Sequence, residues 1–259
     1  MISSIWTNSN ETLYELSSSG RSGALFYYTK DRKYMLKSIA AREFYKLQAI
    51  LADYVDHISR NPDTLMTKFF GMYMLEWKNP DDQGCFGGKT TRIHIIVMDN
   101  LFKVFDAGIR FDLKGSFINR TRLTGDQTIY TGRDINVSLK DNDFRAHMQT
   151  IKFVECFKPN MPPLHEILES DVEFLTRNNL IDYSFLLGEL KQTADEVREC
   201  VKEDINSGRG IYLDSMNRVW LCGFIDPLND YDYTKKFEYC VKGLKHGTRM
   251  SCVPPAIYS

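Results

Sequence analysis

The feature that most constrains how the first hundred residues fold is a helical pattern of apolar residues with strand-like segments on both sides. Large apolar residues recur at helical spacing from Ala40 to Ile58, and "NPDT" at 61–64 ends the pattern. Residues 17–39 predict a strand, a polar turn and a second strand, and "KFFGMYMLEW" and "TRIHIIVM" predict an antiparallel hairpin. We therefore expect a small sheet packed against one helix.

The second half of the chain mixes both kinds of element. A basic, loop-like stretch covers 110–125, and a helix is expected from Leu164 to Asn178, after a proline pair. Strands are expected around 183–190, 210–214 and 218–225. The chain as a whole is predicted to be α+β.

Composition limits the partners. The formal net charge of -1 and pI near 6.5 exclude a bulk polyanion binder, so recognition of phosphate must rest on local basic clusters. Apolar runs such as "IIVM" at 95–98 are too short to span a bilayer, so membrane contact would be peripheral. Six scattered cysteines without CxxC spacing predict reduced thiols in a cytosolic protein.

Lys37 lies on the predicted strand that precedes the helix. Nucleotide sites place a lysine against phosphates behind a glycine-bearing turn, with a helical acid to orient it, and Glu43 is the first such acid here. Gly20 and Gly23 do not match GxGxxG, and a lysine after "YML" is equally typical of a strand residue that reaches solvent.

A basic cluster lies in "IRFDLKGSFINRTR", residues 109–122. Lys114 and three arginines, Arg120 among them, surround Asp112, and Gly115 permits a tight turn. This pattern suits a phosphate monoester. It also suits a solvated loop with surface charge.

Two carboxylates stand singly in apolar surroundings: Asp182 in "LIDYSFLLG" and Asp226 in "LCGFIDPL". Burying a carboxylate costs several kcal/mol unless a cation, metal or hydrogen bonds compensate. The pair predicts a site in which one acid holds Mg²⁺ and the other faces a substrate hydroxyl. The alternative is a pair of loop or cap aspartates.

Residues 233–250 are basic and aromatic, with Lys235 and Lys236 close to the single acid Glu238. Such composition suits an anionic bilayer, where each basic residue adds about 1 kcal/mol. The chain carries no helix-turn-helix, finger or RNA-binding signature, so no nucleic-acid partner is expected. A surface charge cluster without a partner is the alternative.

Taken in order, these segments resemble the phosphatidylinositol phosphate kinases. The similarity runs from about Ser17 to Tyr258 and rests on "NPDTLMTKFFGMY", "FDLKGS", "SLKDNDF", "IDYSFLLG", "FIDPLNDYDYTKK" and "PPAIY". It implies a two-lobed, kinase-like α+β fold with antiparallel sheets in both lobes and a nucleotide cleft between them. Residues 1–259 would form a single catalytic domain, with the N-lobe at 1–101 and the C-lobe at 102–259.

The resemblance also implies roles for single residues, with ATP and Mg²⁺ as cofactors. Catalysis would fall to Lys37 on the phosphates, Asp226 on magnesium and Asp182 near the attacking hydroxyl. The remaining implied positions are Glu43, Gly20 and Gly23 near the nucleotide, Met98, Asn100 and Leu101 in the "VMDNL" hinge beside adenine, and Lys114 and Arg120 on the lipid's existing phosphate.

The basic stretch after Asp226 resembles the family's specificity loop. Lys235 and Lys236 would lie against the membrane, and the position two after them is glutamate in type I 5-kinases and alanine in type II 4-kinases. Glu238 therefore favours phosphatidylinositol 4-phosphate as substrate and phosphatidylinositol 4,5-bisphosphate as product. Type III enzymes, which act on the 3-phosphate, also carry glutamate. The resemblance implies a cytoplasmic protein, peripheral at the cytosolic face of membranes.

The family's N-terminal dimer platform is nearly absent, because the matching segment begins within the first twenty residues. The oligomeric state therefore stays open. Two other functions also remain open: a soluble inositol polyphosphate kinase, and a non-catalytic phosphoinositide-binding module.

Overall fold

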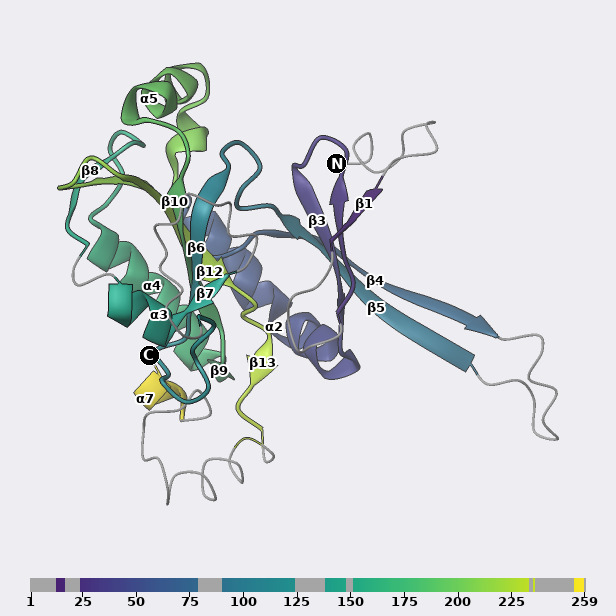
Figure 1. Cartoon of the computed structure of the whole chain (residues 1–259). Helices are drawn as coiled ribbons and strands as arrows, with labels where there is room; N and C mark the ends of the chain where they lie inside the picture. Colours follow the sequence, from purple (N-terminus) through teal and green to yellow (C-terminus); the bar gives the residue numbers. More distant parts are fainter. Residues whose placement is uncertain are drawn as a thin grey trace, which may run out of the picture. The chain divides into compact units, whose positions relative to one another are not determined.

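The computed structural model describes residues 13–16, 24–78, 90–123, 138–147, 151–232, 235 and 254–258. The fold is α+β, as expected, and Figure 1 traces its elements along the chain. The chain divides into two compact units. Unit 1 comprises Met1–Leu51 and Lys68–Lys103, and unit 2 comprises Ala52–Thr67 and Val104–Ser259. The assignment of 1–259 to a single catalytic domain stays a prediction.

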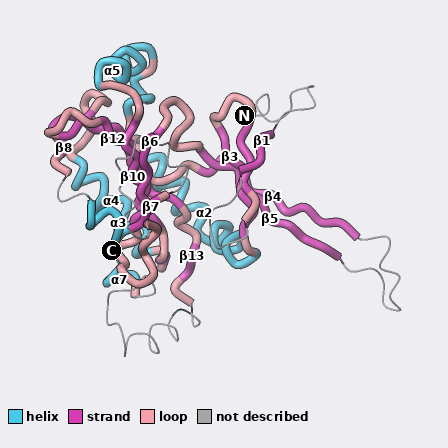
Figure 2. The backbone as a smooth tube through the Cα atoms, viewed as in Figure 1, coloured by secondary structure: helices cyan, strands magenta, loops and turns pink. Residues whose placement is uncertain are grey.

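Unit 1 is built on an antiparallel sheet with the strand order β1-β2-β3-β5-β4 among the described residues. Its strands are β1 Leu13–Leu16, β2 Phe26–Thr29, β3 Tyr34–Ile39, β4 Phe69–Lys78 and β5 Thr90–Asp99. Both predicted hairpins are confirmed, because β2 pairs antiparallel with β3 and β4 with β5. Figure 2 shows the two long strands β4 and β5 lying side by side.

Helix α2, Ala41–Arg60, confirms the helix predicted from apolar spacing. Its start is fixed by Glu43, whose carboxylate accepts the Ala40 N–H at 2.7 Å, as acids in a first helical turn commonly do. The first half packs within unit 1, where the Phe44 ring lies 4.8 Å from the ring of His94 on β5. Leu47 is 1% exposed, so this apolar face supplies part of the unit's core.

The core of unit 1 lies on β5 and not on β4. Ile96 and Val97 of β5 are at most 2% exposed, whereas Tyr73, Leu75 and Trp77 of the outer strand β4 are 45–51% exposed. These three residues alternate along β4 and therefore share one face of the sheet.

Unit 2 contains a mixed sheet with the order β7-β6-β10-β12-β11-β8 in its described part. The strands of unit 2 are β6 Ala107–Leu113, β7 Leu139–Lys140, β8 Phe153–Cys156, β9 Leu180–Ile181, β10 Ser184–Leu190, β11 Ile211–Asp214, β12 Val219–Ile225 and β13 Asn229–Asp230. The strands predicted near 183–190, 210–214 and 218–225 are confirmed. Contrary to the expected antiparallel pairing, the short strands β6 and β7 pair parallel.

The prediction of a loop at 110–113 is wrong. These residues belong to β6 and pair with β10, and Phe111 is fully buried. The apolar alternation of Ile109, Phe111 and Leu113 is a strand signal that the surrounding basic residues obscured.

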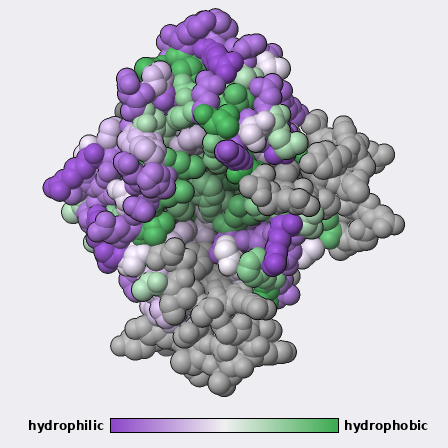
Figure 3. All heavy atoms as spheres, turned by 90° about the vertical axis from the view of Figure 1, so that its left-hand side faces the viewer, coloured by the Kyte–Doolittle hydropathy of each residue, from purple (hydrophilic) through white to green (hydrophobic). Residues whose placement is uncertain are grey.

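The helices of unit 2 are α3 Asp141–His147, α4 Leu164–Arg177, α5 Ala194–Glu203, the 3-10 turn η1 Ile205–Gly208 and α7 Pro255–Tyr258. Helix α4 confirms its prediction to within one residue. Helix α5 was not predicted, although Thr193 and Glu196 form a capping box that marks its start. Figure 3 shows the polar surface at the top of the molecule, where α5 lies.

Cys156, Cys200 and Cys222 are free thiols, as expected, and burial raises the pKa of Cys222 well above its ordinary value. Among the residues that the structure describes, no helix is both long and apolar enough to cross a bilayer.

Candidate active site

Strand pairing brings Asp182 and Asp226 to the same end of two neighbouring strands, β10 and β12, in the unit 2 sheet. Ser184 of β10 pairs with Ile225 of β12, so Asp182 lies just before one strand and Asp226 just after its partner. Beyond these turns, β9 pairs antiparallel with β13. Asp182 and Asp226 therefore each lie in a turn that links one of these strand pairs to the other, and their joint role as a paired-acid site stays a prediction.

Both aspartates have left-handed backbone conformations, with φ of 58° at Asp182 and 56° at Asp226. Aspartate and asparagine tolerate this region better than other residues that carry a Cβ, and such conformations cluster at functional sites. Both residues are partly buried, unlike the buried residues 219–224 of β12. The turns thus present each carboxylate at the edge of the sheet instead of within it.

Two lysines contact Asp182. The ammonium of Lys114 lies 2.9 Å from Asp182 Oδ1 and donates to its backbone carbonyl at 2.7 Å. The ammonium of Lys235 lies 3.7 Å from Asp182 Oδ2. The structure therefore brings together Lys114, Asp182 and Lys235, three of the predicted site residues, with Asp226 at the adjacent strand end.

Arg120 is buried and contacts two carboxylates. Its guanidinium lies 2.6 Å from Asp141 Oδ2 and 3.2 Å from Asp112 Oδ1. Burial lowers the pKa of Arg120, but the carboxylates of Asp112 and Asp141 outweigh it, so the net shift is upward. With 9% exposure and two carboxylate partners, Arg120 supports the loop; its expected contact with a lipid phosphate stays a prediction.

The "SLKDNDF" segment at the start of α3 holds the loop that carries Lys114. Asp141 accepts the Lys114 N–H at 2.9 Å, and Asp143 accepts the N–H groups of Arg122 and Leu123 at 2.8 and 3.1 Å. In the sequence this segment contributes only to the family resemblance and predicts no role of its own. Closely spaced aspartates at a helix start were the signal, because such carboxylates accept backbone N–H groups.

A pocket of about 350 Å³ adjoins Lys114. It is lined by Leu113, Lys114, Gly115, Leu168, Val172, Tyr183, Phe185 and Phe224. Burial raises the pKa of Tyr183 to about 12, so its phenol remains neutral near pH 7.

Lys37 lies in unit 1, on β3 between Phe26 of β2 and Ile96 of β5. Its residue exposure is 8%, and its ammonium lies 5.5 Å from the centroid of the Phe26 ring. Met98 lies two residues after Ile96 and therefore projects from the same face of the sheet as Lys37. These two predicted nucleotide contacts share one face.

The "VMDNL" segment fixes the end of β5 to the β2–β3 turn. The Asn100 side chain donates to the Arg32 carbonyl at 2.8 Å and accepts the Phe102 N–H at 3.1 Å, and Leu101 lies in the turn between them. Glu43 caps α2 through Ala40, and its expected role toward Lys37 stays a prediction. Gly20, Gly23, Lys236 and Glu238 lie outside the described residues.

The predicted magnesium position at Asp226 depends on the donor groups around it. The described residues contain no group of three or more His, Cys, Asp or Glu side chains arranged to hold a metal. Mg²⁺ commonly takes one or two carboxylates, with substrate phosphates and waters as its other ligands. Asp226, with its hard oxygen donors at a partly exposed strand end beside Asp182, fits a metal that arrives with a nucleotide.

Comparison with known proteins identifies the family. The sequence profile of the family described as Phosphatidylinositol-4-phosphate 5-Kinase matches residues 7–210. Because this match covers well over half of the chain, the protein belongs to that family.

Similar full-length proteins come from several lineages. The phosphatidylinositol 4-phosphate 5-kinase of Plasmodium falciparum is 28% identical over 284 residues, which cover 100% of this chain and 16% of that protein. Phosphatidylinositol 4-phosphate 5-kinase 5 of Arabidopsis thaliana is 32% identical over 308 residues, 96% of this chain and 37% of that protein. The chain thus spans well under half the length of these curated relatives.

Proposed function

We propose that this chain is a lipid kinase that transfers the γ-phosphate of ATP to the 5-hydroxyl of phosphatidylinositol 4-phosphate, giving phosphatidylinositol 4,5-bisphosphate. The observation that carries the proposal is the meeting of Asp182 and Asp226 at one sheet edge, with Lys114 and Lys235 on Asp182. Membership of a family described by this activity supports the choice of substrate.

The chemistry requires one proton acceptor near the nucleophile. The inositol oxygen bonds to the γ-phosphorus while the bond from that phosphorus to the β–γ bridging oxygen breaks, and ADP leaves. Asp182 orients the hydroxyl and takes its proton, and Lys114 holds the Asp182 carboxylate through a 2.9 Å contact. Because Lys114 also lies beside the pocket, it offers charge to an incoming phosphate.

Negative charge on the transferring group requires cations. Asp226 would hold Mg²⁺, which supplies charge neutralisation across the β- and γ-phosphates when bound. Lys37 would contact the same phosphates, with Met98, Asn100 and Leu101 beside adenine. A buried ammonium on a rigid strand is pre-organised for this role because little side-chain freedom is left to lose.

Residues 233–250 would contact the anionic bilayer at the cytosolic face of a membrane, with Lys235 placed to link that surface to Asp182. Glu238 would select the 5-hydroxyl. Glu238→Ala should shift preference toward phosphatidylinositol 5-phosphate, and an unchanged preference would remove the basis for this subtype.

The test uses the whole chain with γ-labelled ATP and liposomes that contain the 3-, 4- or 5-monophosphate of phosphatidylinositol, followed by identification of the product's regiochemistry. We expect labelled phosphatidylinositol 4,5-bisphosphate from the 4-phosphate. A folded, ATP-binding protein that labels no lipid would refute the proposal. Faster labelling of free inositol phosphates would assign it to soluble substrates instead.

A further inference from the structure

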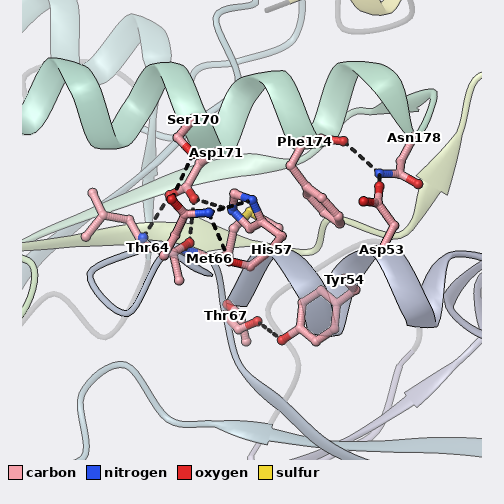
Figure 4. Close-up of polar contacts among 12 residues, drawn as sticks. Asp53, Tyr54, His57, Thr64, Met66, Thr67, Ser170, Asp171, Phe174 and Asn178 are labelled. Atoms are coloured by element: carbon pink, nitrogen blue, oxygen red, sulfur yellow. Dashed lines mark hydrogen bonds and ion pairs between the residues drawn. The ribbon is translucent and has the colours of Figure 1, made fainter. Parts of the chain in front are cut away.

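A buried polar cluster joins α2 and α4 within unit 2 (Figure 4). Asp171 of α4 is fully buried, and its Oδ1 lies 2.8 Å from Nε2 of His57. The Asn61 amide lies 3.2 Å from the other ring nitrogen, so the hydrogen-bond network assigns the ring proton to Nε2, which donates to Asp171. His57 also stacks on Phe174, with ring centroids 4.7 Å apart. The cluster is therefore fixed from both helices.

Asp171 uses its remaining acceptor sites on the segment that follows α2. Thr64 Oγ1 donates to Asp171 Oδ1, and the Leu65 N–H donates to Oδ2 at 2.8 Å. Thr64 Oγ1 in turn accepts the Met66 N–H at 3.1 Å. One buried carboxylate thus determines the backbone path of residues 64–66.

The held segment pairs directly with the end of β12. The Phe224 N–H donates to the Leu65 carbonyl at 2.8 Å, and the Phe224 carbonyl accepts the Thr67 N–H at 3.1 Å and its hydroxyl at 2.5 Å. Met66 and Phe224 form a parallel bridge. Tyr54 of α2 completes the attachment by donating to the Thr67 carbonyl at 2.9 Å (Figure 4).

Phe224 lies two residues before Asp226, and the other edge of β12 pairs with β10, which begins just after Asp182. The end of β12 therefore has two neighbours: β10 on one edge and the Asp171-held segment on the other. A shift of that segment changes where β12 ends, and with it the position of Asp226 relative to Asp182.

We infer that Asp171, with His57 and Thr64, is a positioning residue for Asp226: it fixes the segment at 64–67, which fixes the end of β12. This inference rests on the proposed function, because it assigns Asp226 to the metal. Partners that orient metal ligands without touching the metal change metal affinity about 10- to 100-fold when removed. Neither its helix nor its neighbours mark Asp171 as part of the site in the sequence.

Asp171→Asn tests the inference, since it replaces an acceptor oxygen with a donor amide that faces other donors. Affinity for MgATP should fall about tenfold, while affinity for ATP in the presence of a chelator should change little. Hydrogen exchange should accelerate in peptides that cover 219–230. These readouts do not require lipid turnover.

Asp214→Asn is the matched control. Asp214 is 2% exposed and holds the opposite end of β12, where its Oδ2 accepts the Trp220 indole N–H at 3.0 Å. A purely structural role for Asp171 predicts equal losses of MgATP affinity in both variants at equal loss of stability. We expect the Asp214 variant to keep MgATP affinity within about twofold of the parent.

Thr64→Val provides a second variant if Asp171→Asn does not fold, because it keeps the side-chain shape and removes only the hydroxyl. Parental MgATP affinity together with parental exchange at 219–230 in a folded variant would overturn the inference. A parent chain that binds no MgATP would overturn the proposed function and the inference together. If the parent binds MgATP, and Asp171→Asn and Asp214→Asn bind it equally well at equal stability, the inference alone is overturned.

Discussion

Unit 2 contains two kinds of aspartate that differ in surroundings more than in sequence. Asp141, Asp143, Asp171 and Asp214 are at most 6% exposed, and each accepts at least two hydrogen bonds from neighbouring groups. Asp182 and Asp226 are partly exposed and lie in left-handed turns at the sheet edge. The first kind holds the fold together, and the second presents charge at the candidate site.

The comparison shows the limit of a useful sequence rule. A single carboxylate among apolar residues singled out Asp182 and Asp226, but Asp214 in "GIYLDS" has similar neighbours. What separates the two kinds is burial: the first kind is buried and stabilised by several donors, whereas Asp182 and Asp226 are partly exposed. Substitutions of the buried aspartates should therefore lower mainly stability, and substitutions of Asp182 and Asp226 should lower mainly activity.

The largest effect is expected at Asp226. Asp226→Asn should lower lipid phosphorylation by at least about a thousandfold, because an amide is a poor magnesium ligand. Its melting temperature should stay within about 2 °C of the parent, since asparagine also tolerates φ near 56°. Labelled-ATP assays and thermal melts of the same preparation test both. Near-parental turnover would place Asp226 with the structural aspartates.

Asp182→Asn should lower turnover by about several hundredfold, the range for loss of a general base, with little change in stability. Saturation with lipid and ATP should not restore the rate, because the loss lies in the chemical step. Lys114→Met is the companion variant: it should raise the KM for lipid as well, since Lys114 lies at both Asp182 and the pocket. A purely structural role for Asp182 would instead appear as a lower melting temperature.

Asp141→Asn should act mainly on stability. Removing the carboxylate leaves the buried Arg120 guanidinium with Asp112 as its remaining ionic partner, which should lower the free energy of unfolding by about 2 kcal/mol. Denaturant titration measures this change. A variant with parental stability and lost turnover would move Asp141 into the catalytic group and break the comparison.

The smallest effect is a pH dependence at Asp214. Burial raises its pKa, but hydrogen bonds from Arg218 and Trp220 outweigh burial and hold the pKa below the ordinary 3.8. The ionised form is therefore stabilised by folding, and this contribution is complete above pH 3.8 and disappears as the pH falls through the lowered value. Asp214→Asn should cost about 1.5 kcal/mol at pH 7.

The difference in stability between parent and Asp214→Asn should then shrink in acid. Denaturant midpoints measured from pH 7 downward test this expectation. A difference that stays constant below about pH 3 would mean that packing, and not the carboxylate's charge, accounts for the loss.

Local signals predicted much of the fold. The helical spacing of apolar residues in α2 and α4 and the apolar segments of β3, β5, β10 and β12 depend only on neighbours in sequence. The positions of these elements were therefore predicted to within a few residues. The signal failed where an element was short or its alternation was masked by charge, as in β6 and α5. Helix α5 was missed even though its start is marked in the sequence by the capping box of Thr193 and Glu196.

The sequence by itself determined which residues are proposed to carry chemistry: Lys37, Asp182 and Asp226 are lone charges among apolar neighbours, Lys114 belongs to a basic cluster, and all four follow from resemblance to a family. Only the tertiary structure decided which carboxylates hold the fold and which face outward. That choice depends on donors such as His57, the Leu65 N–H and Arg120, which come from segments distant in sequence. A carboxylate's role is set by the groups that surround it in space, and folding alone brings those groups together.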